Sequence, residues 1–154
     1  AAGRRDNARS LLEQVAADDT ISWDVSQRLA AFVRGALAVG DVELGTRICE
    51  RASPHWPMFQ AGVAAGRAHL AEADGDPDLA AARYAEVAER WRGLGARLEE
   101  GYAVLGRGRC LAALGNPAAA ATLQEARRLF VAMGAHARVE ECDLLLAQVS
   151  RLSS

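Results

Sequence analysis

Three short turn signals recur along the chain and separate stretches of apolar residues at helical spacing. They are Gly40-Asp41, Gly75-Asp76-Pro77 and Gly115-Asn116-Pro117. Glycine takes the left-handed conformation that ends one helix, Asp or Asn caps the next helix, and proline fits the first helical position. Each signal therefore predicts that one helix ends and another begins within a few residues.

These signals return at a nearly constant interval. Gly40 and Gly75 are 35 residues apart, and Gly75 and Gly115 are 40 residues apart. A second break, Leu94-Gly95-Ala96, recurs 39 residues later as Met133-Gly134-Ala135. A period of about 34 to 40 residues with two helices in each unit is typical of stacked helical hairpins.

Between the signals, apolar residues recur at steps of three and four, as along one face of a helix. Tyr84, Val87, Trp91 and Leu94 are one such series. Alanine, the strongest helix former, supplies much of the apolar composition, and no run of alternating β-branched residues predicts a strand. The sequence therefore predicts an all-α fold, an α-solenoid of stacked antiparallel helical hairpins with about eight helices.

We expect these helices to form a single domain over residues 1–154. It comprises a lead helix at 6–17, hairpins at 23–52, 57–94 and 97–134, and a closing helix at 136–152. The chain does not begin with methionine, so we expect it to be a fragment of a larger protein.

Charge and composition argue against several classes of partner. The net charge of −2 gives no basic field for direct nucleic-acid binding. No apolar run approaches the ~18 residues of a membrane span. Cys49, Cys110 and Cys142 lie far apart in apolar helical patterns, which predicts buried, reduced thiols and a cytoplasmic protein.

No pattern in the sequence predicts catalysis, a metal site or a cofactor. The three histidines are scattered, unlike the ligands of a metal site. Glu99-Glu100 and Glu140-Glu141 are adjacent pairs that diverge on a helix, and we interpret them as solvated faces. Gly106-Arg107-Gly108 lies within a helical pattern, and we interpret it as a close packing contact, not a nucleotide-binding loop. We therefore expect the chain itself not to be an enzyme.

Three arginines are the candidate binding residues. Arg67 and Arg107 occupy equivalent positions 40 residues apart in successive first helices, and Arg109 lies beside Arg107 in the sequence. Guanidinium groups on the concave side of a repeat array could bind a carboxylate or phosphate of a protein partner or of a small anionic effector. Alternatively, they are framework residues paired with acidic side chains or carbonyls of the neighbouring repeat. The sequence leaves both interpretations open.

Key small and bulky positions of the hairpins match the tetratricopeptide pattern. In the first hairpin they are Leu29, Phe32, Gly40, Gly45, Ala52 and Pro57. The second hairpin has Ala68, Gly75, Ala80 and Tyr84 at such positions, and the third has Gly108 and Gly115. The first aromatic residue of the pattern is missing in every copy, so the chain resembles this family without matching it strictly.

The stretch from Ala73 to Val139, which includes Tyr84, Trp91 and Gly106-Arg107, resembles the carboxy-terminal repeats of large bacterial signalling ATPases. Such repeats follow the ATPase module in LuxR-type transcription regulators and in some multidomain adenylate or guanylate cyclases, notably of actinobacteria. The resemblance implies a scaffold, interaction or sensor segment that contacts a protein partner or other domains of its own chain. Any ATPase, cyclase or DNA-binding part would lie elsewhere in the parent protein.

The two ends of a helical stack need a capping element. In the closing helix we expect Val139, Cys142, Leu146 and Val149 to face inward and Arg138, Glu141 and Gln148 to face outward. The lead helix offers only a short apolar stripe. We therefore expect any homodimer to form through the N-terminal end, near Leu11, Val15 and Trp23.

Overall fold

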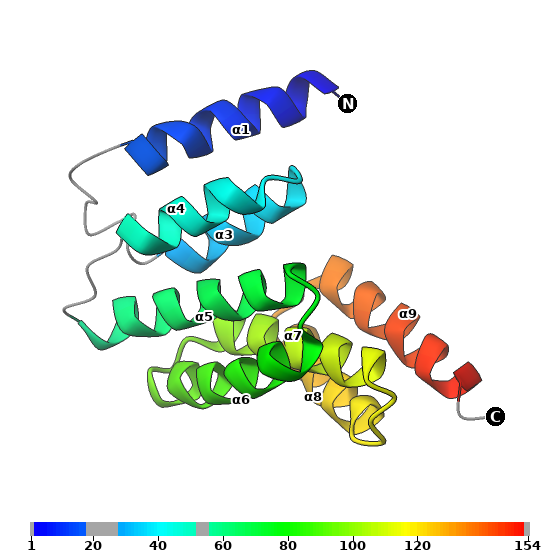
Figure 1. Cartoon of the computed structure of the whole chain (residues 1–154). Coiled ribbons are helices and arrows are strands. Elements are labelled where there is room, and N and C mark those ends of the chain that lie inside the picture. Colours follow the sequence, from blue (N-terminus) through cyan, green and yellow to red (C-terminus); the bar gives the residue numbers. More distant parts are fainter. Residues whose placement is uncertain (1, 18–27, 52–55, 153–154) are drawn as a thin grey trace. The chain divides into compact units, whose positions relative to one another are not determined.

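The computed structural model describes residues 2–17, 28–51 and 56–152, and all of the regular structure in these ranges is helical (Figure 1). The helices are α1 (Ala2–Ala17), α3 (Leu29–Ala38), α4 (Val42–Arg51), α5 (Pro57–Ala73), α6 (Pro77–Gly93), α7 (Arg97–Ala113), α8 (Ala119–Ala132) and α9 (His136–Leu152). The prediction of an all-α, solenoid-like fold with about eight helices is confirmed for these ranges. Trp23 and His55 lie outside the described residues.

The contacts between helices divide the chain into two compact units, Ala1–Asp74 and Gly75–Ser154. In the first unit, α3 packs against α4 and α5, and α1 packs against α3 and α4. In the second unit, α6 packs against α7, α7 against α8, and α8 against α9. Helices that follow one another thus lie side by side within each unit. The predicted hairpin at 57–94 spans the boundary, with α5 in one unit and α6 in the other.

Each unit has its own apolar core. In the first unit, Leu12, Leu29, Val33, Leu44 and Ile48 belong to one buried cluster. In the second unit, the largest fully buried side chains are Tyr84, Trp91, Leu105, Leu123 and Phe130. Most of these residues come from the apolar stripes that predicted the helices, and helix formation here is stabilised by burial of those stripes.

The predicted helix breaks are left-handed glycines. Gly40, Gly75, Gly95, Gly115 and Gly134 have φ values from +63° to +83°. At Gly95, the glycine amide donates to the Arg92 carbonyl at 3.1 Å, and the Ala96 amide donates to the Trp91 carbonyl at 3.0 Å. The same pair of bonds closes the turns at Gly40, Gly115 and Gly134. This is the Schellman motif, which satisfies the last carbonyls of one helix within the turn itself.

The predicted N-caps are confirmed at two of the three signals. Oδ1 of Asp41 accepts from the Leu44 amide at 2.9 Å, and Oδ1 of Asp76 accepts from the Leu79 amide at 3.0 Å. At the third signal the prediction was wrong. Oδ1 of Asn116 accepts from the Ala118 amide at 2.9 Å, which makes an Asx turn, and α8 begins only at Ala119. Pro117 therefore lies in this turn and not at the first helical position.

Two glycines of α7 allow this helix to approach both of its neighbours closely. A β-carbon on Gly106 would lie 2.5 Å from Cζ of Tyr84 in α6. A β-carbon on Gly108 would lie 2.6 Å from Cδ2 of Leu123 in α8. The interpretation of Gly106-Arg107-Gly108 as a packing contact is confirmed.

We expect Gly106→Ala to destabilise the protein by about 1–3 kcal/mol, because the new methyl group would overlap the fully buried Tyr84 ring. Gly93→Ala is the matched control. It also lies in a helix, but nothing approaches its β-carbon position within 4 Å, so it should stabilise by up to about 1 kcal/mol through helix propensity. Chemical denaturation of both variants measures the difference. Equal stability of the two variants would mean that α7 can shift away from Tyr84 at little cost.

Candidate functional site

The three candidate arginines are distributed over two units and have different environments. Arg67 is an exposed residue of α5 in the first unit, and Arg107 is an exposed residue of α7 in the second. Arg109 is half-buried, and its NH1 group donates to Oε1 of Glu141 in α9 at 3.2 Å. The framework interpretation therefore describes Arg109.

Arg107 and Arg109 do not form one anion-binding cluster within α7. Residues two apart on a helix do not face each other. Arg109 faces α9, where its partner Glu141 lies, whereas Arg107 is exposed to solvent. An anionic ligand at Arg109 would have to compete with the carboxylate of Glu141.

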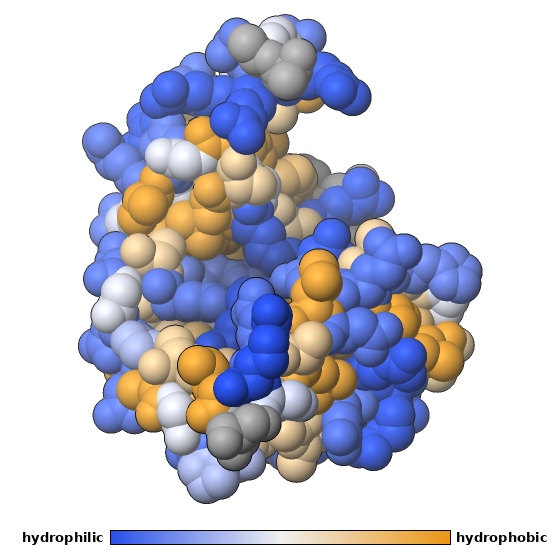
Figure 2. All heavy atoms as spheres, turned by 90° about the vertical axis from the view of Figure 1, so that its right-hand side faces the viewer, coloured by the Kyte–Doolittle hydropathy of each residue, from blue (hydrophilic) through white to orange (hydrophobic). Residues whose placement is uncertain are grey.

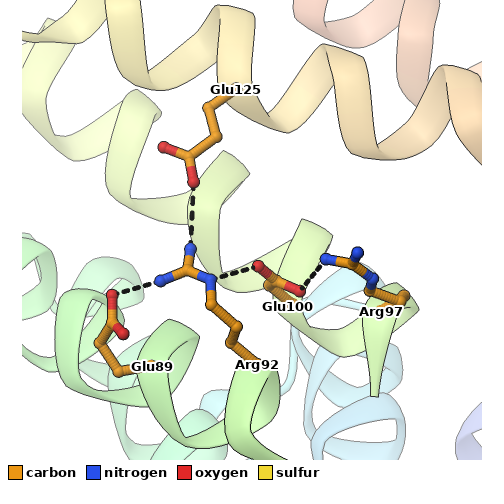
Figure 3. Close-up of polar contacts among 5 residues, drawn as sticks. All are labelled: Glu89, Arg92, Arg97, Glu100 and Glu125. Carbon is orange, nitrogen blue, oxygen red and sulfur yellow. Dashed lines mark hydrogen bonds and ion pairs between the residues drawn. The ribbon is translucent and has the colours of Figure 1, made fainter. Parts of the chain in front are cut away.

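The most connected polar group of the second unit surrounds Arg92, near the C-terminal end of α6 (Figure 3). Its Nε donates to Oε1 of Glu100 in α7 at 2.8 Å, and its NH2 group donates to Oε1 of Glu125 in α8 at 3.1 Å. Glu89 also accepts from Arg92. These hydrogen bonds, first with Glu89 and then with Glu100, raise the pKa of Arg92. One guanidinium group thus connects three helices.

Glu100 is the buried member of this network. Its side chain is only 2% exposed, and Oε2 accepts from NH1 of Arg97 at 3.3 Å in addition to the bond from Arg92. The interpretation of Glu99-Glu100 as a solvated face was wrong for Glu100. A buried carboxylate is stable only when paired, and the two guanidinium groups meet this requirement.

Three consecutive residues attach α9 to its neighbours. Glu141 accepts from Arg109 of α7, and Cys142 is completely buried. Asp143 accepts from Nε of Arg127 in α8 at 2.6 Å, which raises the pKa of Arg127. Successive helical residues point in different directions, so each of the three has a different neighbour.

The expected orientation of α9 was therefore wrong in part. Arg138 and Glu141 are half-buried, and NH1 of Arg138 donates to Oε2 of Glu141 at 2.5 Å. They belong to the ion-paired edge near α7 and not to the outward face. Cys142 faces inward as predicted, whereas Val139, Leu146 and Val149 are only half-buried.

The three cysteines are free and buried, as predicted. Burial raises the pKa of the Cys49 thiol to about 11, and the negative charge of Glu50 adds to the effect while Arg67 opposes it. Burial likewise raises the pKa of Cys142 to about 11, with Glu141 and Asp143 as further causes. Both thiols are therefore poor nucleophiles near neutral pH.

Histidines and acids do not gather into a metal site in the described part of the chain. No group of three or more His, Cys, Asp or Glu residues in these ranges could hold a metal ion. His69 is buried within α5, and His136 is exposed at the start of α9.

The surface carries several large hydrophobic side chains. Leu11 in α1 is 62% exposed, and Leu144 and Leu152 in α9 are 67% and 82% exposed. On the face drawn in Figure 2, hydrophobic side chains are interspersed with hydrophilic ones.

The second unit also has a cleft of about 280 Å³, lined in part by Ala112, Asn116, Ala119, Val149 and Leu152. Its lining suits an aliphatic group better than an anion, because Asn116 is its one polar side chain and already accepts from Ala118.

Comparison of the chain with known protein families, with curated proteins and with solved structures finds no match. Among the residues in the described ranges, no helix has both the length and the apolar character that crossing a membrane requires.

The network around Arg92 was not predicted from the sequence, and it makes a double-mutant cycle informative. We expect Arg92→Ala to destabilise the protein by about 1–3 kcal/mol, because Glu100 would stay buried, lose the 2.8 Å hydrogen bond from Arg92 and keep the 3.3 Å bond from Arg97. In a Glu100→Leu background, the same substitution should cost little, since no buried charge would be left. Arg127→Ala, which breaks an exposed pair, should cost less than Arg92→Ala. Equal losses from Arg92→Ala in both backgrounds would show that Glu100 does not depend on Arg92.

A second prediction concerns the thiols. Because the pKa of Cys49 and of Cys142 rises from 9.0 to about 11, folding should lower the thiolate fraction about 100-fold below pH 9. Alkylation of these residues by iodoacetamide, followed by mass spectrometry, should be correspondingly slower in the folded protein than in denaturant. The same shift lowers folding stability as the pH rises from 9 toward 11. Alkylation at equal rates in both states would show that the thiols are accessible.

Proposed function

We propose that this chain is a non-catalytic protein-interaction or scaffold domain, and that it serves as the regulatory repeat region of a larger bacterial signalling or transcription regulator. The fold supports this proposal, because the helices packed in series within each unit present side chains from several helices to solvent. The resemblance of Ala73–Val139 to repeats of ATPase-linked regulators supports the choice of parent protein. The free, buried cysteines are those expected of a cytoplasmic protein.

The observation that carries the proposal is the contrast between a tightly fixed framework and an exposed apolar surface. Glycine contacts and ion pairs fix α7 between α6 and α8. Leu144 and Leu152 nevertheless remain 67% and 82% exposed on the adjoining α9. Exposed large hydrophobic side chains on a rigid framework are what a protein partner can bury.

Among the candidate arginines, Arg107 is best placed in the second unit to contact a partner. It is exposed, whereas the guanidinium group of Arg109 is already paired with Glu141. We favour a carboxylate of a protein partner over a small anionic effector. Arg107 and Arg109 point in different directions from α7, so they cannot both bind the same small anion.

The reading frame upstream of Ala1 tests the choice of parent protein. We expect it to encode an ATPase, a nucleotide cyclase or a DNA-binding module. A frame that encodes none of these would exclude a role in such a regulator, although an interaction role could still be tested by binding.

The interaction itself can be measured by calorimetric titration of the chain with the separately expressed remainder of its parent protein. We expect Arg107→Glu to weaken binding about tenfold, because it reverses a charge at the contact. Arg128→Glu, on an exposed arginine of α8, is the matched control and should leave binding unchanged. Undetectable binding of the unmodified chain, or equal effects of the two variants, would contradict the proposed surface.

A further inference from the structure

The outward face of α9 carries a stripe of residues whose charges and sizes are complementary to those of the same stripe on a second copy of the chain. Glu140, Leu144, Ala147 and Arg151 follow one another at steps of four, three and four, so they lie along one line of the helix. All four are exposed, and Leu144 is the large hydrophobic residue at the middle of the stripe. The opposite side of α9 holds the buried Cys142, so this stripe faces away from α8.

A second α9 laid antiparallel on this stripe brings unlike residues together. When Glu140 lies opposite Arg151 of the second copy, Leu144 lies opposite Ala147 of that copy, because both pairs have the same midpoint in the sequence. Two-fold symmetry then repeats each pair. The small alanine side chain leaves room for the leucine, and the opposite charges attract at each end.

The antiparallel direction follows from the same residues. A parallel pair in register would place Glu140 against Glu140 and Arg151 against Arg151 of the second copy, which is repulsive. Of the residues that flank the stripe, Gln148 and Ser150 are uncharged, and the exposed Asp143 is already paired with Arg127 of α8. Nε of Arg151 donates to the Ala147 carbonyl within its own helix at 3.2 Å, and the two terminal nitrogens can donate to a carboxylate of the second copy.

We propose that the chain self-associates through α9, with Glu140, Leu144, Ala147 and Arg151 forming an antiparallel helix pair with a second copy. The interface is small and its charges are exposed, so the dimer is weak and reversible. This inference shares Leu144 with the surface proposed for a protein partner, and sedimentation of the chain alone tests it separately from that proposal.

The structure gives less support to the N-terminal surface. Leu12 is buried and Val15 is half-buried, so of the apolar stripe expected there only Leu11 is well exposed, at 62%. Trp23 lies outside the described residues. Self-association through the N-terminal end is the alternative that the experiment below distinguishes from association through α9.

Analytical ultracentrifugation of the chain up to about 1 mM tests the proposal. Glu140→Arg should weaken the dimer about tenfold or more, because it replaces two attractive pairs with two repulsive ones. Arg151→Glu should do the same. The double variant Glu140→Arg with Arg151→Glu should restore association to within about threefold of the unmodified chain. It exchanges the two charges, so each pair between the copies is again attractive.

Leu144→Glu should abolish the dimer, and Leu11→Glu is its matched control at an exposed leucine of another helix. Circular dichroism should show unchanged helix content in all variants, because each altered residue is exposed. A monomeric unmodified chain, a dimer that survives Leu144→Glu, or a charge exchange that fails to restore association would overturn the proposal. Loss of the dimer in Leu11→Glu would also overturn it, in favour of the N-terminal end.

Discussion

The left-handed glycine between consecutive helices is the constraint on which the packing of the second unit depends. In the second unit a Schellman turn joins consecutive helices, the helices on either side of it pack against each other, and residues about equidistant from the turn meet. Arg92 and Glu100 have their midpoint at Ala96, next to Gly95. Gly108 and Leu123 have theirs between Gly115 and Asn116. The position of each glycine thus sets which residues contact each other.

Close approach and ion pairing then act together on α7. Gly106 and Gly108 lack the β-carbons that would collide with Tyr84 and Leu123, so the backbone of α7 can lie close to both neighbours. This proximity leaves Glu100 almost without solvent, which would be costly for an unpaired carboxylate. Arg92 and Arg97 offset that cost, and Arg92 extends the connection to Glu125 in α8. Apolar packing and charge pairing therefore favour the same register of the three helices.

The sequence could predict whatever depends on a residue and its own helix. The left-handed glycines and the caps at Asp41 and Asp76 are of this kind. Burial of Glu100 depends instead on the helix across the turn, and considering the adjacent pair Glu99-Glu100 alone gave the wrong environment. The third cap failed for a local reason, because Asn116 can bond either to a turn amide or to the amide of a helix that begins earlier. For the candidate arginines, the repeat period gave equivalent positions, but it carried no information about which of them would find an acidic partner.

The same rule of equidistance accounts for two of the ion pairs that join neighbouring helices. Across the turn at Gly95, Arg92 meets Glu100, and across the turn at Gly134, Arg127 meets Asp143. Arg107 has no such acid, because the residue equidistant from the turn at Gly115 is Gln124, and the corresponding residue across the turn at Gly95 is Ala85. A guanidinium group without an acid opposite it gains nothing from the interior and stays hydrated, in agreement with the exposure of Arg107.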